Sequence, residues 1–325
     1  MSETINTSFA ANAISENIFN TFKWDLHELH DQNFACAFSE HNKKTHPCDC
    51  VFHYVDPYTG KDLYFNTDLK SYAKKSITAS TIKTALDSLA MSIQCAAVSE
   101  SWQDAYLVQS SNLDYEVRGF LFVYNHDNSY SNDFHEQFSE INLTTFPIAK
   151  GNLIHFMGPK QIEDCFSIAC DINICIGKFG IQKYTFWYPD MMMHKVKHGE
   201  YWEQPATIEQ LSSPILITKY QKHDGQTGYI IYYKRSGSEI DEFVYLIDML
   251  SHYQILSEEI HITLKFIGQD RDANIMATFK NAKLKYMQIW NMDEVREKQL
   301  NLIVPERVTR FTEHYNIGEL GWSEK

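Results

Sequence analysis

The chain has 325 residues, of which 44% are hydrophobic and 14% aromatic, and its formal net charge is −13. This length and composition are typical of a folded globular protein larger than one average domain, and they exclude an intrinsically disordered chain. The acidic charge excludes nucleic-acid binding through the overall field of the protein, so any such contact has to come from a local basic patch or a partner.

The first half of the chain alternates between helical and strand-like segments. The spacing of apolar residues predicts helices over residues 14–29 and 80–98, and another that begins near residue 161. Apolar runs predict strands over residues 34–38, 50–55, 63–69 and 117–124. The segment DPYTG, between the second and third of these strands, contains turn-favouring Asp, Pro and Gly and predicts a hairpin. This alternation is typical of an α/β domain with a covered central sheet.

The second half is predicted to form a smaller α+β unit. We expect strands over residues 213–221, 228–237 and 261–268, and helices over residues 239–253 and 273–290. We therefore divide the chain into residues 1–185 and 186–325, and we expect the second domain to serve regulation, oligomerisation or partner binding. The sequence contains no internal repeat that we can detect.

The lack of a recognisable targeting signal and the cysteine usage both indicate a soluble, cytoplasmic protein. No apolar stretch is long enough to cross a bilayer, and the N-terminus lacks the charged start and apolar run of a secretory signal. Seven cysteines, an odd number, favour reduced thiols over a disulfide framework. The spacing within the pair Cys48 and Cys50, and within the series Cys165, Cys170 and Cys175, differs from that of a zinc knuckle. Buried thiols are the preferred interpretation.

The strongest chemical pattern lies in the predicted hairpin. If its turn is centred between Tyr58 and Thr59, paired residue numbers sum to 117, which places Asp49 opposite Asp68 with Cβ atoms about 4.5–5.5 Å apart. Strand alternation then puts Lys70 on the same face as Asp68. Two facing carboxylates repel each other, and a divalent cation such as Mg²⁺ would offset that repulsion. Lys70 could then orient or help to deprotonate an attacking water and balance charge on phosphorus, which predicts phosphodiester hydrolysis. The alternative is a solvated hairpin face with a salt bridge.

At these residues the chain resembles the PD-(D/E)xK nuclease superfamily. Pro47-Cys48-Asp49 matches the first part of the family motif and Asp68-Leu69-Lys70 the second, with one extra residue after the proline and Asp where Glu is more frequent. The resemblance covers roughly residues 14–175. It implies a restriction-endonuclease-like core, with a central mixed sheet flanked by helices, in which Asp49 and Asp68 bind Mg²⁺ or Mn²⁺ and Lys70 activates water.

The resemblance also implies supporting residues on the two helices that flank the hairpin. Many members carry a glutamate on the preceding helix that completes the metal shell, and Glu16 is preferred here over Glu28. On the following helix, Lys83 or Gln94 would contact a phosphate of the nucleic acid.

A local group of lysines answers the objection raised by the acidic net charge. Residues 61–83 contain five lysines and two aspartates, so this span is basic within an acidic protein. Lys74 and Lys75, directly after the predicted site, are natural phosphate contacts that would position the nucleic-acid backbone without reading bases.

These observations lead to three hypotheses. The first is a Mg²⁺-dependent endonuclease acting on DNA and controlled by a partner subunit or by homo-oligomerisation; the resemblance places it in bacterial anti-phage defence. The second is a catalytically silent, nuclease-like scaffold or sensor subunit in a protein–nucleic-acid complex. The third is a different metal-dependent phosphoesterase, which would need more His and Asp ligands than the sequence offers at a fixed spacing.

Overall fold

A computed structural model describes the following residues of the chain: 12–13, 15–107, 114–139, 141, 151–188, 202–256, 260–268, 270–291 and 293–309. The chain divides into two compact units, with the division between Phe166 and Ser167. Within the described residues, no helix combines the length and the apolar character needed to span a membrane.

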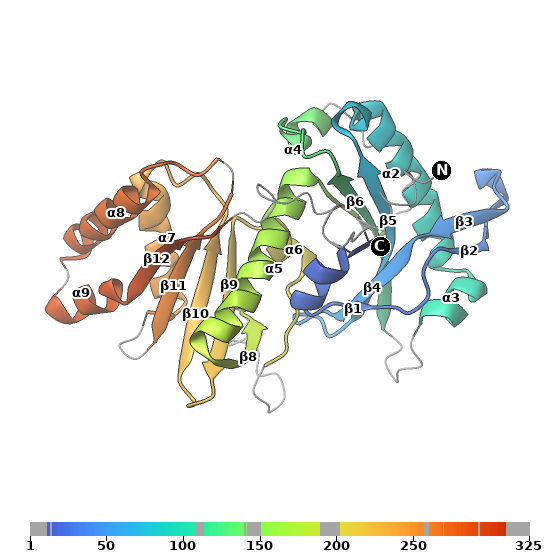
Figure 1. The fold of residues 1–325 in the computed structure, drawn as a ribbon. Coiled ribbons are helices and arrows are strands. Elements are labelled where there is room, and N and C mark those ends of the chain that lie inside the picture. Colours follow the sequence, from blue (N-terminus) through green and yellow to red (C-terminus); the bar gives the residue numbers. More distant parts are fainter. Residues whose placement is uncertain are drawn as a thin grey trace, which may run out of the picture. The chain divides into compact units, whose positions relative to one another are not determined.

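The first unit is built on a five-stranded mixed sheet (Figure 1). Its strands lie in the order β1 (Asp25–Leu26), β4 (Cys50–Val55), β5 (Asp62–Tyr72), β6 (Tyr115–Asn125) and β7 (Ile154–Met157). β1, β4 and β5 are antiparallel, whereas β6 and β7 run parallel to β5. A mixed sheet flanked by helices is the architecture expected for a restriction-endonuclease-like core, so this prediction is confirmed.

Both faces of this sheet are covered. Side chains of alternate strand residues point to opposite sides, so the two faces pack against different elements. On one face, Phe65 of β5 stacks on Trp24, with ring centroids 4.8 Å apart, and Phe19 of the helical residues 15–21 joins the same cluster. On the other face, α2 (Ala79–Ala96) packs Ile82, Leu86, Leu89 and Ile93 against β6. The apolar stripe predicted for residues 80–98 is therefore the buried face of α2.

Shorter elements complete the first unit. A two-stranded hairpin, β2 (Gln32–Ala35) and β3 (Thr45–Cys48), holds the 3-10 helix η1 (Ser39–His41) in its loop. The 3-10 helix η2 (Lys74–Ser76) follows β5, and α3 (Glu100–Tyr106) and α4 (Phe134–Phe138) follow α2 and β6.

The first predicted helix is shorter than expected. Residues 15–21 are helical, but Lys23 has a left-handed backbone with φ of 63°. The Trp24 N–H donates to the Phe19 carbonyl at 2.9 Å and the Lys23 N–H to that of Asn20 at 3.0 Å, the pattern of a Schellman helix end. The helix prediction to residue 29 is wrong because lysine, rather than the usual glycine, occupies the left-handed position.

The second unit repeats the strand order and directions of the first. Its sheet runs β8 (Ile181–Phe186), β9 (Ile215–Lys222), β10 (Thr227–Tyr233), β11 (His261–Phe266) and β12 (Ile303–Arg307). The first three are antiparallel and the last two are parallel to β10. Helix α7 (Ile240–His252) joins β10 to β11, as α2 lies between β5 and β6, and α8 (Ile275–Trp290) and α9 (Glu294–Asn301) precede β12. The common topology was not visible as a repeat in the sequence.

Helix α5 (Pro159–Phe179) contains the division between the units. In its second half, Asp171 accepts a hydrogen bond from the Tyr232 hydroxyl at 2.9 Å and pairs with the Lys265 ammonium at 3.3 Å. The same ammonium lies 2.6 Å from the Glu306 carboxylate. These contacts attach the second half of α5 to the C-terminal sheet, and the division between the two compact units falls inside this helix.

Candidate active site

The β4–β5 hairpin has the register expected from its turn. Cys50 pairs with Thr67 and Val55 with Asp62, so that paired numbers sum to 117. Beyond the last pair, the Asp49 N–H donates to the Thr67 carbonyl at 3.2 Å, which brings Asp49 beside Asp68. The predicted juxtaposition follows directly from this register.

Asp49, Asp68 and Lys70 line one cleft, of about 570 Å³, between the hairpin and α2. The structure therefore brings together the three residues that were predicted to carry the chemistry. The remaining lining residues come from β3, β5 and α2: Pro47, Thr67, Tyr72, Ser80, Thr81, Thr84, Ala85, Ser88, Leu89 and Ser92.

Each of the three side chains is held by a neighbour. The Leu69 N–H donates to Asp49 Oδ2 at 2.7 Å, which fixes that carboxylate. Lys70 Nζ contacts Asp68 Oδ1 in a close ion pair. The side chains of Lys70 and Asp68 are 32% and 18% exposed, so both remain accessible from the cleft.

The charges of the site act on one another. Burial, followed by repulsion from the Asp68 carboxylate, raises the pKa of Asp49 from 3.8 to about 6. Burial lowers the pKa of Lys70, but attraction by Asp68 and a hydrogen bond to it, with further attraction by Asp49, together outweigh burial, so the net shift is upward and the ammonium stays charged. Two adjacent carboxylates, of which Asp49 is costly to ionise, form a donor set that suits a hard divalent cation. The residues present therefore fit a metal ion held between Asp49 and Asp68.

Glu16 and Gln94 lie outside the cleft lining among the described residues. Glu16 is exposed on the helical residues 15–21, and its charge acts on the Cys50 thiol, which alternation places on the face opposite Asp49. Gln94 Oε1 lies 3.1 Å from His41 Nε2.

The predicted phosphate-binding lysines are all exposed. Lys83 lies on α2 outside the described cleft lining, whereas Lys74 and Lys75 belong to η2, which begins two residues after β5 ends. The Asp127 carboxylate accepts a hydrogen bond from the Lys74 N–H at 3.0 Å, which fixes the start of η2. This bond, with two more from Asn125 and Ser129, outweighs burial and lowers the pKa of Asp127.

One feature of the cleft was missed by the sequence analysis. Ser80, Thr84, Ser88 and Ser92 recur every four residues along α2 and form a hydroxyl-bearing wall. Lys43 Nζ lies 3.3 Å from Ser88 Oγ at this wall. The four-residue spacing of small hydroxyl residues beside an apolar stripe was the available signal.

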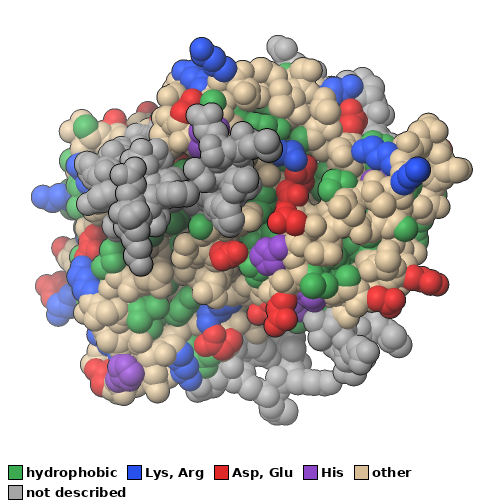
Figure 2. All heavy atoms as spheres, turned by 45° about the vertical axis from the view of Figure 1, so that its right-hand side comes forward, with side chains coloured by type: hydrophobic (Ala, Val, Ile, Leu, Met, Phe, Trp, Pro, Cys, Tyr) green, Lys and Arg blue, Asp and Glu red, His purple; other side chains and the backbone are tan. Residues whose placement is uncertain are grey.

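On the face of the molecule that Figure 2 shows, Lys and Arg side chains are scattered among acidic ones. Any phosphate contact made by the described residues of this face is therefore local, as the net charge predicted.

The N-terminal part of the chain matches a known protein family. Residues 1–161 match the family model described as the GAPS4 protein PD-(D/E)XK nuclease domain. A search of curated proteins found no match. The matched region contains Asp49, Asp68, Lys70 and the whole of α2.

Proposed function

Since residues 1–161 belong to the PD-(D/E)XK nuclease superfamily, we propose that the protein is a Mg²⁺- or Mn²⁺-dependent endonuclease that hydrolyses phosphodiester bonds in DNA. The observation that carries this proposal is the convergence of Asp49, Asp68 and Lys70 on one cleft. A solvated hairpin face would not need two neighbouring carboxylates, one of them with a raised pKa.

The roles of the residues follow from their contacts. Asp49, fixed by the Leu69 N–H, and Asp68 would hold the metal ion. Such an ion supplies Lewis-acid polarisation of the phosphoryl group and a more acidic water. Lys70 would orient that water and donate to a non-bridging phosphate oxygen as negative charge develops there. The hydroxyl wall of α2 and the exposed Lys74 and Lys75 would hold the phosphates on either side of the scissile bond.

The catalytic assignment is tested by DNA cleavage. Supercoiled plasmid, linear duplex and single-stranded RNA are incubated with the full chain in Mg²⁺, in Mn²⁺ and without added metal. We expect metal-dependent cleavage of DNA, and a loss of about a hundredfold or more in Asp68→Ala and Lys70→Ala. Asp114→Ala and Lys61→Ala are matched controls. These two residues form an exposed ion pair, with 3.1 Å between the Lys61 ammonium and the Asp114 carboxylate, and neither belongs to the cleft lining. Unchanged cleavage in the first two variants would remove the site assignment.

We further propose that the nuclease acts in anti-phage defence under the control of a partner or of self-association. Support comes from the matched family, which is defence-associated, and the second unit would then serve regulation or oligomerisation. Protection of bacteria against phage should be lost with Asp68→Ala and kept with Asp114→Ala. Protection that persists with Asp68→Ala, together with no cleavage by the wild type, would favour the catalytically silent scaffold, for which the acidic surface is the main support.

A further inference from the structure

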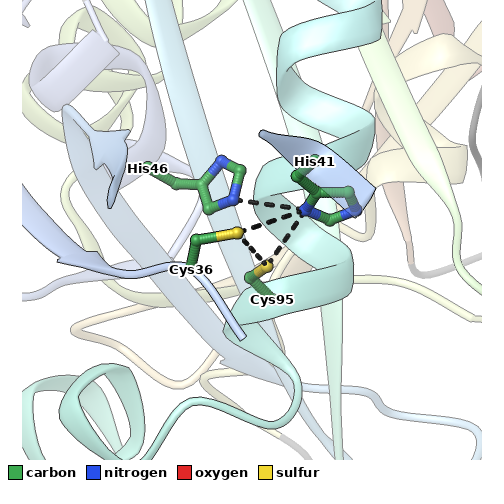
Figure 3. Close-up of side chains that lie close together, drawn as sticks. All are labelled: Cys36, His41, His46 and Cys95. Atoms are coloured by element: carbon green, nitrogen blue, oxygen red, sulfur yellow. Dashed lines mark hydrogen bonds between the residues drawn. The ribbon is translucent and has the colours of Figure 1, made fainter. Parts of the chain in front are cut away.

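Four potential metal ligands converge next to the β2–β3 hairpin (Figure 3). Cys36 directly follows β2, His41 ends η1, His46 lies on β3, and Cys95 lies in the last turn of α2. One ligand atom from each residue lies within 4.8 Å of all the others. In Figure 3 the two sulfurs and the two imidazole rings point toward one another.

Four of the six distances between ligand atoms match the edges of a tetrahedron around zinc, and the two between His46 and the sulfurs lie within 4.8 Å. Zn–S bonds of about 2.3 Å and Zn–N bonds of about 2.0–2.1 Å give edges of about 3.8 Å between sulfurs, about 3.3 Å between nitrogens and about 3.6 Å between sulfur and nitrogen. The Cys36 and Cys95 Sγ atoms are 3.7 Å apart, and His41 Nδ1 lies 3.4 Å from His46 Nε2. His41 Nδ1 lies 3.5 Å from Cys36 Sγ and 3.3 Å from Cys95 Sγ.

The surroundings of the cluster also suit a metal. Gln94 Oε1 lies 3.1 Å from His41 Nε2, so it can accept a hydrogen bond from Nε2–H and favour the tautomer in which Nδ1 is free to bind a metal. The Ala37 N–H points at Cys95 Sγ at 3.4 Å, as backbone amides do at metal-bound thiolates. His46 and Cys95 are fully buried, and Cys36 and His41 are partly buried, so much of the cluster is shielded from solvent.

We propose that Cys36, His41, His46 and Cys95 bind a structural zinc ion. Two sulfur and two nitrogen donors in tetrahedral arrangement select zinc, and four protein ligands leave no open position for catalysis. A disulfide between Cys36 and Cys95 is the competing interpretation. It needs the sulfurs to approach to about 2.05 Å, and it leaves the two converging imidazoles without a function.

The proposed zinc ion would connect the β2–β3 hairpin to α2. Three of its ligands lie in or beside the hairpin and the fourth on the helix that forms the wall of the cleft. Asp49 follows β3 directly, three residues after His46. The zinc ion would thus hold β3, the strand that leads into Asp49, against α2, which forms the opposite wall of the cleft. It would take no part in the reaction.

The first test is the metal content of the purified full chain. We expect about one zinc per chain in the wild type, and less than about a tenth of that in Cys36→Ser and Cys95→Ser. Cys170→Ser is the matched control, because Cys170 is half-buried like Cys36 but lies outside the cluster. Asp68→Ala should retain zinc, which separates this site from the metal of the cleft and from the fate of the proposed function. Wild-type protein without zinc after growth and refolding in zinc would overturn the proposal.

A second test does not depend on folding of the variants. Replacing zinc by Co²⁺ in the wild type should give the visible bands of tetrahedral cobalt and a thiolate-to-metal charge-transfer band. Titration of thiols under denaturing conditions should count all seven cysteines. Octahedral cobalt bands without charge transfer, or two thiols missing as a disulfide, would contradict the zinc site.

Discussion

Burial and the neighbouring Asp68 carboxylate make ionisation of Asp49 costly, and the hydrogen bond from the Leu69 N–H offsets only part of that cost. The pKa of Asp49 in the folded chain, about 6, exceeds the value of 3.8 without the fold. The folded state therefore binds the proton more tightly than the unfolded state. In the metal-free protein, this group lowers stability as the pH rises from 3.8 to about 6, and the full cost remains above that window.

Asp49→Asn should accordingly stabilise the metal-free protein while it abolishes cleavage. The amide removes the charge and can still accept the hydrogen bond from the Leu69 N–H. We expect a gain of about 1–2 kcal/mol in the free energy of unfolding at pH 7.5, which shrinks as the pH falls below about 6. Denaturant unfolding at several pH values in buffers without Mg²⁺ measures this gain. A loss of stability at pH 7.5 would show that the ionised Asp49 carboxylate does not destabilise the folded protein.

At the level of single residues, the proximity of the three proposed catalytic residues was predictable, whereas the proposed zinc ligands were not. Asp49, Asp68 and Lys70 follow from one pairing sum within a short hairpin, which depends only on local turn chemistry. The zinc ligands combine a loop with the end of a helix that begins more than thirty residues later. Spacings between cysteines alone could not reveal a cluster in which two of the four ligands are histidines.

Among the elements, α2 has two faces with different tasks. Its apolar stripe packs on β6, and its Ser and Thr residues face the cleft. Neutral hydroxyls can donate to phosphate oxygens without adding charge beside the metal site. Sequence periodicity predicted the first face, whereas the role of the second depends on where the hairpin carboxylates lie.

Thr84→Glu should weaken substrate binding, because it places a carboxylate in the cleft wall where phosphates would lie. Thr84 is exposed and belongs to the lining, so the change should cost little stability. We expect the Kd for DNA to rise about tenfold, corresponding to about 1.4 kcal/mol. Thr59→Glu, in the hairpin turn, is the control with the same change of charge. Equal effects of both substitutions would indicate long-range repulsion and argue against the cleft as the binding path.

In the whole molecule, the same sheet topology occurs twice with different residues at the corresponding position. The β4–β5 ladder ends at Cys50 and Thr67, and Asp49 and Asp68 follow. The β9–β10 ladder ends at Ile215 and Tyr233, and the next residues are Pro214 and Lys234. A proline and a lysine offer no oxygen ligands of the carboxylate type, so we assign the metal-dependent chemistry to the first unit alone.

In place of a pair of neighbouring carboxylates, the second unit contains an ionic cluster around the buried Lys265. Its side chain is 5% exposed and pairs with Asp171 and Glu306. Lys265→Met should cost about 3–5 kcal/mol, because it leaves the Asp171 carboxylate buried without a counter-charge. The double variant Asp171→Leu/Lys265→Met should recover part of this loss, as denaturant unfolding would measure. A double variant that is as unstable as the sum of both single variants would contradict this coupling.

The two-unit organisation was only partly predictable. Strand and helix patterns identified most of the second unit, but β8 and β12 were missed because their short, partly polar runs resemble loops. A shared topology needs no shared sequence, since many apolar patterns satisfy the same pairing directions.

Helix α5 limits how the protein can be dissected. The region that matches the family model ends at residue 161, whereas α5 runs from Pro159 to Phe179. A fragment cut at that point would lose Ile162 and Cys165, both 1% exposed, and would uncover the apolar surface that they protect. Isolated nuclease fragments should therefore retain the complete helix, and an insoluble fragment ending at residue 161 would reflect a severed helix rather than an inability of the catalytic sheet to fold.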